Sequence, residues 1–379
     1  MHEYDYIITG SGASGLMLAY RMANDPFFDD KSILIIDKEK KLSNDRTWCF
    51  WEKGNGEWDD VVLRSWDHIF FKSDTVDKKL SIAPYTYKMI RSAKFYERLW
   101  KVVDAKENIT FVEDTVINIS HKTHSASVLT IKTEYHTAKL FNSIAFDKGY
   151  KQQLKYPALE QHFVGWFIET DEDCFDDSAA TFMDFTVNQK GNTRFMYILP
   201  ISKKKALFEY TLFSKSLLDK SEYDREIRSY LKKKGIKEYR IIEKEEGIIP
   251  MTSYKFWKHN STNVLNIGTI GGWSKASTGF TFMNITEKTK ELVEFLKKES
   301  TLKKFRKSTR FWKYDLILLD VLYRNNHLGS KFFSQLFKRN PPQKILKFLN
   351  EETSFTEEMR IMFSTPSPQF IVSFFRRLM

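Results

Sequence analysis

Three glycines near the N-terminus have the spacing of a phosphate-binding turn. They are Gly10, Gly12 and Gly15, and Asp37 follows the last of them by 22 residues. In such a turn the first glycine permits a tight bend, the second admits a pyrophosphate close to the backbone, and the third lets a helix pack against a strand. We therefore expect Gly10, Gly12, Ala13 and Gly15 to contact a pyrophosphate, and Asp37 to accept hydrogen bonds from an adenosine ribose.

The segments around these glycines predict the strand–helix–strand unit that positions them. Residues 4–9 suit a buried strand, residues 16–22 have helical apolar spacing, and residues 32–36 form a second apolar stretch before the acid. The helix N-terminus would present free N–H groups and a positive dipole end to the pyrophosphate. Since all these parts are present, we predict dinucleotide binding rather than an ordinary strand–helix turn. The position at the N-terminus favours FAD over NAD.

Segments with strand-like alternation occupy the middle of the chain. Residues 108–146 alternate apolar and polar positions between turn signals, which is typical of a β-meander. Residues 181–187, 194–201 and 206–213 then form candidate strands joined by short polar connections. These patterns predict a second, antiparallel sheet.

Two acids lie within these predicted strands, at Asp184 and Glu209. Because side chains alternate between the faces of a strand, Glu209 should share a face with Leu207 and Thr211, and Asp184 with Phe182. A carboxylate inside a sheet needs a partner or acquires a raised pKa, and proteins often use such a group in acid–base chemistry. A surface position or a structural ion pair is the alternative for either acid.

Further short motifs follow one another along nearly the whole chain. They occupy residues 44–51, 87–92, 161–166, 182–186, 194–200, 208–211, 247–252, 271–272 and 277–280. In number and order these motifs resemble those of the flavin-dependent lycopene cyclases of carotenoid biosynthesis, especially the bacterial lycopene β-cyclases. One departure is Asn142, which begins Asn-Ser-Ile where the family usually has Asp-x-Arg. These residues cannot form the family's local ion pair, so Asn142 receives no site role.

The resemblance implies an α/β fold with three parts. An FAD-binding Rossmann-type domain of the glutathione-reductase and hydroxybenzoate-hydroxylase type would comprise residues 1–150 and 251–290. An antiparallel substrate-binding sheet domain would comprise residues 151–250. A helical C-terminal cap would occupy residues 291–379.

The resemblance also implies further cofactor contacts. Arg46 and Arg91 would reach the phosphates or the ribityl chain, although a surface salt bridge is the alternative for each. A strand over residues 263–267 and the glycines after it would form a second flavin segment, and residues 277–279 would open a helix aimed at the flavin ring. The expected contacts of this segment are Gly268, Gly271, Gly272, Thr278 and Gly279.

The activity that the resemblance implies is lycopene β-cyclisation, an intramolecular lyase (isomerase) reaction. A carboxylic acid adds a proton to the terminal double bond of the linear polyene, the ring closes through a carbocation, and a proton is lost. Glu209 is the best candidate for the acid, with Asp184 as a supporting or alternative acid–base residue. The FAD would be needed in reduced form, with NAD(P)H as the electron source but not consumed in turnover. The alternative is a redox flavoenzyme on the same fold, a monooxygenase or a polyprenyl reductase, which would oxidise NAD(P)H stoichiometrically.

The amino-acid composition excludes several other classes of protein. Hydrophobic residues make up 42% and charged residues 29% of the 379, which excludes a disordered chain. Cys49 and Cys174 are too few for a disulfide framework or a cysteine-based zinc site, so we expect a reducing cytosol and no metal. The N-terminus lacks the basic region of a signal peptide, and no stretch reaches the ~18 apolar residues of a membrane span.

The C-terminal quarter is basic and helical. From Thr286 onward there are 19 basic and 10 acidic residues, so +9 of the net charge of +11 lies there. Residues 311–322, 331–339 and 343–350 have helical apolar spacing, and two prolines interrupt the chain at 365–368. A solvated helical cap is one interpretation of this region. Peripheral contact with anionic membrane lipid is the other, since lycopene or a related linear carotenoid is insoluble in water.

We expect the protein to be cytoplasmic and peripherally associated with the membrane, with other carotenoid-pathway enzymes as candidate partners. Nucleic-acid binding is disfavoured because it would leave the glycine turn without a purpose.

Overall fold

The computed structural model describes residues 2–146, 149–306, 308–365 and 367–378. The chain divides into two compact units, each built from three segments. Unit 1 contains residues 1–48, 91–153 and 254–309, and unit 2 contains residues 49–90, 154–253 and 310–379. Residues 49–90, which we expected in the first domain, thus belong to unit 2, where strand β5 (His68–Ser73) pairs with strand β13 (Ala180–Asp184). The C-terminal helices from residue 310 belong to unit 2 as well.

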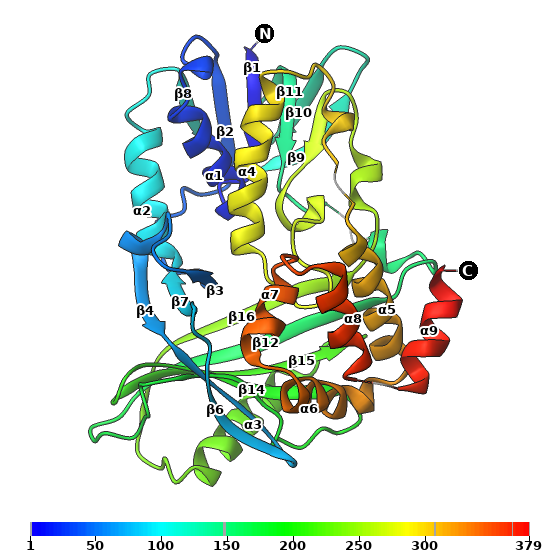
Figure 1. Ribbon diagram of the computed structural model, residues 1–379. Coiled ribbons are helices and arrows are strands. Elements are labelled where there is room, and N and C mark those ends of the chain that lie inside the picture. Colours follow the sequence, from blue (N-terminus) through cyan, green and yellow to red (C-terminus); the bar gives the residue numbers. More distant parts are fainter. Residues whose placement is uncertain (1, 147–148, 307, 366, 379) are drawn as a thin grey trace. The chain divides into compact units, whose positions relative to one another are not determined.

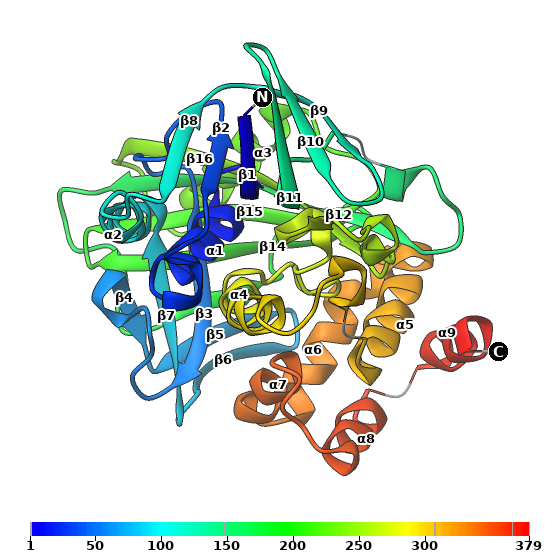
Figure 2. The same cartoon turned by 90° about the horizontal axis from the view of Figure 1, so that it is seen from above.

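Unit 1 is built on a largely parallel sheet with helices against it (Figure 1, Figure 2). Its strand order is β8-β2-β1-β11-β10-β9, and β17 pairs in parallel with the end of β11. The strands are β1 (His2–Thr9), β2 (Ile33–Asp37), β8 (Ile109–Glu113), β9 (Val116–His121), β10 (Ala126–Thr130), β11 (Glu134–Asn142) and β17 (Val264–Asn266). The helices are α1 (Ala13–Ala23), α2 (Ser92–Val103) and α4 (Phe282–Leu296), and α1 contacts both of the others.

Continuous apolar runs explain the parallel centre of this sheet. All five residues of β2 are buried, and Ile7, Leu34 and Leu140 from adjacent strands meet in one hydrophobic cluster. Parallel strands that are covered by helices on both faces are expected to have continuous apolar sequences. The predicted strands at residues 4–9 and 32–36 and the helix at 16–22 are confirmed within a few residues.

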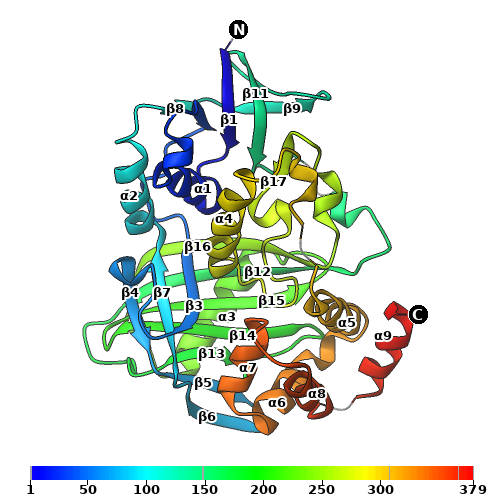
Figure 3. The ribbon, with the colours of Figure 1, turned by 45° about the horizontal axis from the view of Figure 1, so that its top comes forward.

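Unit 2 contains a long sheet of order β16-β12-β15-β14-β13-β5-β6, whose strands lie side by side in Figure 3. All neighbours in it are antiparallel except the parallel pair β13–β5. The strands are β5 (His68–Ser73), β6 (Val76–Ser81), β12 (Ala158–Glu169), β13 (Ala180–Asp184), β14 (Thr193–Ser202), β15 (Lys205–Ser214) and β16 (Arg240–Thr252). A smaller sheet of order β3-β7-β4 contains β3 (Thr47–Lys53), β4 (Val62–Trp66) and β7 (Tyr85–Arg91).

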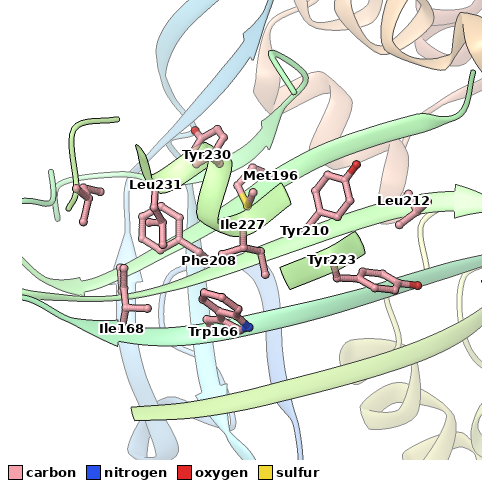
Figure 4. Close-up of a cluster of buried hydrophobic side chains, with 12 residues drawn as sticks. Trp166, Ile168, Met196, Phe208, Tyr210, Leu212, Tyr223, Ile227, Tyr230 and Leu231 are labelled. Atoms are coloured by element: carbon pink, nitrogen blue, oxygen red, sulfur yellow. The ribbon is translucent and has the colours of Figure 1, made fainter. Parts of the chain in front are cut away.

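The helices of unit 2 cover the long sheet on different faces. They are α3 (Lys220–Lys233), α5 (Arg310–Arg324), α6 (Gly329–Arg339), α7 (Pro342–Leu349), α8 (Phe355–Phe363) and α9 (Pro368–Leu378). Helix α3 packs on one face through the cluster in Figure 4, where Tyr223, Ile227 and Tyr230 meet strand residues that include Trp166 and Tyr210. On the other face, Phe333 of α6 contacts Phe213 of β15 with ring centroids 6.3 Å apart. The sheet is therefore buried on both sides at these positions.

Short 3-10 helices complete the described chain at Pro26–Phe28, Asp59–Val61, Gly149–Lys151, Phe256–His259, Gly268–Gly271, Leu302–Lys304 and Asn326–Leu328. Among the helices in the described ranges, none combines enough length with enough apolar character to cross a bilayer. The three predicted strands around Asp184 and Glu209 are present, although β13 ends at Asp184 rather than at residue 187. Strands β12 and β16, which pair along most of their length, were recognised only as motifs in the sequence.

Candidate active site and cofactor site

The glycine turn of unit 1 has the geometry of a close-packed strand–helix connection. Gly10 has a φ of +89°, which an L side chain rarely adopts. A Cβ on Gly15 would lie 1.9 Å from the Gly10 carbonyl oxygen, so any side chain there would separate the helix from the turn. A Cβ on Gly12 would meet no heavy atom within 4 Å. The open space beside Gly12, which caps α1, therefore fits the close approach of a ligand.

Asp37 lies directly at this turn. Its Oδ2 accepts hydrogen bonds from the backbone N–H of Ser11 at 2.6 Å and from the Ser11 hydroxyl at 2.8 Å. Its Oδ1 accepts from the backbone N–H of Lys38 at 2.7 Å. The structure therefore brings the acid at the end of β2 to the glycine turn at the end of β1, as a dinucleotide site requires.

Asn142, which had no predicted role, links the carboxyl ends of the strands β1, β11 and β17. Its Oδ1 accepts from the Thr9 hydroxyl of β1 at 2.9 Å, and its amide nitrogen donates to Asn266 Oδ1 of β17 at 3.0 Å. The side chain is buried. An amide network thus joins the ends of β1, β11 and β17.

The second glycine segment lies against the first. A Cβ on Gly268, whose φ is +64°, would lie 2.5 Å from the Ser14 Oγ in the first turn of α1. Gly271 is also tightly packed, because its Cβ would lie 2.3 Å from the Asn266 carbonyl oxygen. Gly272, with a φ of +71°, ends this turn. Segments that are more than 250 residues apart in the chain therefore meet at the N-terminus of α1.

The predicted helix at residues 277–279 begins later than expected. Thr278 and Gly279 lie in a turn closed by the Gly279 N–H donating to the Lys275 carbonyl at 2.8 Å. Gly279 has a φ of +72°, which breaks a helix, and α4 starts at Phe282. The N-terminus of α4 is therefore displaced from the predicted position by about one helical turn.

Arg46 and Arg91 are brought together through Ser92. The Ser92 hydroxyl oxygen accepts the backbone N–H groups of Asp45 and Arg46 at 2.9 and 3.0 Å. Arg91 is buried, whereas Arg46 is exposed and donates to the Asp45 carbonyl at 2.7 Å. The two residues thus belong to one hydrogen-bonded corner of unit 1.

Glu209 lies in the middle of the long sheet of unit 2. Its side chain is 8% exposed, and Oε1 accepts a hydrogen bond from the Thr211 hydroxyl at 2.6 Å. Burial, reinforced by the negative charge of Glu245, raises the pKa of Glu209 to about 8, although the Thr211 bond opposes the shift. Glu209 is therefore a carboxylic acid that keeps its proton near neutral pH.

Two phenols and a thiol surround this acid. Tyr197 is the cross-strand neighbour of Glu209, and its hydroxyl lies 2.5 Å from that of Tyr87. Cys49 interacts with both phenols, and burial raises the pKa of its thiol to about 12. Burial also raises the pKa values of both tyrosines well above 10. These groups are therefore neutral hydrogen-bonding partners at physiological pH.

Aromatic rings continue from Tyr87. The Trp51 ring is stacked on it with centroids 6.3 Å apart, and Phe182 meets it edge-on at 5.7 Å. Trp66 contacts the same phenol at 6.3 Å. The Trp51 indole N–H donates to the Leu346 carbonyl of α7 at 3.2 Å, which fixes the ring. The structure therefore places several π-faces in the same part of unit 2 as the acid.

Asp184 is not part of this cluster. Its Oδ2 accepts a hydrogen bond from Tyr230 of α3 at 2.6 Å, and its Oδ1 accepts the backbone N–H of Thr186 at 2.9 Å. Lys234 Nζ lies 3.6 Å from the carboxylate. Burial would raise the pKa of Asp184, but these bonds and the lysine charge outweigh it and hold the pKa below its usual value. Asp184 is therefore an ionised residue beneath α3.

A break in strand alternation explains the difference from the sequence prediction. We expected Asp184 and Phe182 on one face, but the register of β13 shifts between Thr181 and Asp184. Phe182 consequently faces Tyr87, whereas Asp184 faces Tyr230. The two predicted acids lie on opposite faces of the sheet, since Asp184 pairs with Met196 and Glu209 with the adjacent Tyr197.

The place of Tyr197 beside Glu209 could not be predicted from the sequence. An even hairpin between β14 and β15 would pair Tyr197 with Tyr210, but a register shift between Pro200 and Ser202 pairs it with Glu209. Tyr87, Cys49 and Trp51 lie in motifs that carried the resemblance, but they were assigned no role. Their convergence depends on how β3 and β7 pack in unit 2, which local patterns do not reveal.

Solved structures define the class of fold. A geranylgeranyl bacteriochlorophyll reductase-like protein from Thermoplasma acidophilum is similar with a TM-score of 0.61 at 11% identity, and the match covers 100% of both chains. A flavoprotein/dehydrogenase from Cytophaga hutchinsonii is similar with a TM-score of 0.56 at 11% identity, covering 96% of this chain and 99% of the other. The protein therefore has the predicted α/β fold with a Rossmann-type unit.

The sequence comparisons define the family. The family described as lycopene cyclase protein matches residues 5–376, which is nearly the whole chain. The chain therefore belongs to the lycopene cyclase family. The lycopene beta-cyclase of Pantoea ananas is 24% identical over 258 residues, which cover 66% of this chain and 63% of that relative. The matched region thus spans less than two thirds of the relative's length.

Proposed function

We propose that the protein is a lycopene β-cyclase in which Glu209 donates the proton that starts ring closure. The observation that carries this proposal is a buried glutamic acid with a pKa of about 8. A carboxylic acid with an ordinary pKa would be ionised at neutral pH and could not protonate an alkene.

In this proposal Glu209 supplies the proton for one isomerisation. Its carboxyl O–H bond breaks as a C–H bond forms at the terminal double bond of the polyene, which leaves a carbocation and a Glu209 carboxylate. The ring closes when a second double bond attacks the cation. A ring proton then returns to the Glu209 carboxylate, which regenerates the acid and gives the β-ring, so that product and substrate have the same composition.

The rings around Tyr87 suit the cationic stage of this reaction. The faces of Trp51, Tyr87 and Phe182 present negative π-density, and cation–π attraction contributes about 0.5–2 kcal/mol for each favourable ring. The raised pKa values of Tyr87 and Cys49 keep these groups protonated, so they cannot quench the cation as anions. The cluster thus combines a proton donor with non-nucleophilic surroundings.

We further propose that unit 1 binds FAD. The residues that would hold it are those at the open turn beside α1, with Asp37 toward the ribose and the corner of Arg46 and Arg91 toward the phosphates or ribityl chain. The FAD would be needed in its reduced form, with NAD(P)H as the electron source. The glycines of the second segment, from Gly268 to Gly279, would complete the site.

The fate of NAD(P)H separates this proposal from a redox enzyme on the same fold. The test is anaerobic incubation of the flavin-loaded protein with lycopene, followed by pigment analysis and measurement of NAD(P)H. A cyclase yields β-rings in large excess over the NAD(P)H oxidised. Equimolar oxidation with a reduced or hydroxylated product would instead identify a polyprenyl reductase or a monooxygenase.

We also propose peripheral contact of unit 2 with membrane lipid on the cytoplasmic side. In α9 the side chains of Ile371, Val372, Phe374 and Phe375 are between 48% and 59% exposed. Three arginines, Arg324, Arg376 and Arg377, surround the single carboxylate of Asp320 beside this helix. An apolar helix surface with excess positive charge is typical of helices that lie on anionic lipid. Such contact would give access to a water-insoluble carotenoid.

A further inference from the structure

Four residues form one row across the long sheet of unit 2. Glu245 of β16 pairs with Gly165 of β12, Gly165 pairs with Glu209 of β15, and Glu209 pairs with Tyr197 of β14. Directly opposed residues in a sheet project to the same face. The carboxyl groups of Glu245 and Glu209 therefore face the same side of the sheet, separated by one residue that has no side chain.

The space over Gly165 is occupied by the two acidic side chains. A Cβ on Gly165 would lie 3.2 Å from Glu245 Cγ and 3.6 Å from Glu209 Cβ. It would also lie 2.9 Å from Leu207 Cδ1, which is closer than real Cβ contacts come. Both glutamate stems thus border the gap that the glycine leaves open.

We propose that Glu245 is a positioning residue for cyclisation, whose negative charge across Gly165 extends to higher pH the range in which the buried Glu209 stays protonated. The inference rests on the proposed role of Glu209 as the proton donor. Glu245 is partly exposed on the outermost strand of the sheet, where water can solvate a carboxylate.

The other titratable groups around Glu209 are neutral at physiological pH. Cys49 of β3, Tyr87 of β7 and Tyr197 of β14 interact electrostatically with one another, and burial raises the pKa of each. They supply hydrogen bonds but no charge. In the part of the chain that the structure describes, Glu245 supplies a negative charge that acts on Glu209 from a neighbouring strand.

The test compares Glu245→Gln with Glu246→Gln. Glu246 is the adjacent residue on β16, but it faces the opposite side and pairs with Lys220 at 3.1 Å on the exposed surface.

The size of the expected shift follows from the spacing of the two acids in the row. Glu245 and Glu209 lie two strands apart, so their backbones are separated by about 10 Å. At that separation and an effective dielectric constant of about 20, one unit charge shifts the pKa of the other acid by about one unit.

We therefore expect the loss of cyclisation at high pH to begin about one pH unit lower in Glu245→Gln, with unchanged rate at low pH. Glu246→Gln should match the wild type. Glu245→Asp, which retains the charge, should restore the wild-type profile. An alkaline midpoint in a folded Glu245→Gln protein equal to that of the wild type would overturn the role of Glu245.

A second readout does not depend on activity. Infrared spectroscopy of the flavin-loaded protein without substrate detects the C=O stretch of a protonated carboxyl group, and the band absent from Glu209→Gln belongs to Glu209. Its titration should move to lower pH in Glu245→Gln. If Glu209→Gln is inactive but the Glu209 band titrates at the same pH in Glu245→Gln and in the wild type, only the role of Glu245 is refuted. If the band moves in Glu245→Gln but Glu209→Gln is still active, the proposed function of Glu209 is refuted instead.

Discussion

Asp184→Asn should weaken the fold of unit 2 and leave cyclisation intact. The carboxylate lies beneath α3, where it accepts hydrogen bonds from Tyr230 and from the backbone of Thr186. It lies on the face of the sheet opposite to Glu209. The substitution keeps the shape of the side chain, but it removes the charge and replaces one of the two accepting oxygens by a donating NH2 group.

The expected loss of stability follows from the bonds that change. Hydrogen bonds to a charged group contribute about 1.5–3 kcal/mol each, against about 0.5–1.5 kcal/mol for neutral ones. In Asp184→Asn the amide oxygen accepts the Thr186 N–H and the amide NH2 donates to the Tyr230 hydroxyl, so that two charged bonds become neutral at a cost of about 2 kcal/mol. The ion pair with the partly exposed Lys234 adds at most about 1 kcal/mol. A decrease of about 2–3 kcal/mol in the free energy of unfolding is expected.

The pH dependence of this loss has a defined sign. The folded-state pKa of Asp184 is below its usual value, so the unfolded state binds the proton more readily. The stability contributed by Asp184 is complete above the unfolded pKa of about 3.9 and disappears as the pH falls through the folded value. The difference between wild type and Asp184→Asn should therefore shrink below about pH 4.

The assay is denaturant unfolding of the flavin-loaded proteins together with pigment analysis per folded protein. Tyr230→Phe is the matched control, because it removes one donor to Asp184 without touching the carboxylate, and it should lose about 1.5–3 kcal/mol with full activity. Wild-type stability in an Asp184→Asn protein that no longer cyclises would refute this reasoning and return Asp184 to the catalytic residues.

Three further predictions concern the other parts of the proposal. Gly12→Val should fold but lose FAD, because the added side chain enters space that is open in the protein, and flavin absorbance after purification checks this. Cyclisation should fall about tenfold per pH unit above about pH 8 as Glu209 ionises, measured as product formed across a pH series. Binding to anionic liposomes should weaken with salt and in a Phe374→Ser/Phe375→Ser protein, but not in Leu154→Ser, which removes another exposed apolar residue. Co-sedimentation that is insensitive to both changes would contradict the lipid contact.

The elements of unit 1 could be predicted from the sequence because their signals are local. The apolar run of β2 and the glycines after β1 specify a turn whose geometry depends on few distant residues. The start of α4 was placed too early because Gly279 at a positive φ extends the preceding turn to Thr281. The role of Asn142 was missed because its partners lie on strands far apart in the sequence.

The surroundings of the two acids were harder to predict. Alternation placed Glu209 correctly beside Thr211, since β15 is regular there. The same rule failed for Asp184 because a register shift in β13 reverses the faces, and nothing in the local pattern marks that shift. The pKa of Glu209 depends first on its burial and then on Glu245, which comes near it through the pairing of three strands.

Cyclisation by Glu209→Gln protein is the most direct test of the central claim. The amide has nearly the size of the acid and can still accept a hydrogen bond from Thr211, but it cannot protonate an alkene. Flavin-loaded Glu209→Gln and Asp184→Asn proteins would be incubated anaerobically with lycopene and reductant, and the β-ring products quantified against bound flavin. The account predicts a loss of at least about 10²–10⁴-fold for Glu209→Gln and near-wild-type yield for Asp184→Asn. Near-wild-type β-ring formation by a flavin-loaded Glu209→Gln protein would contradict it.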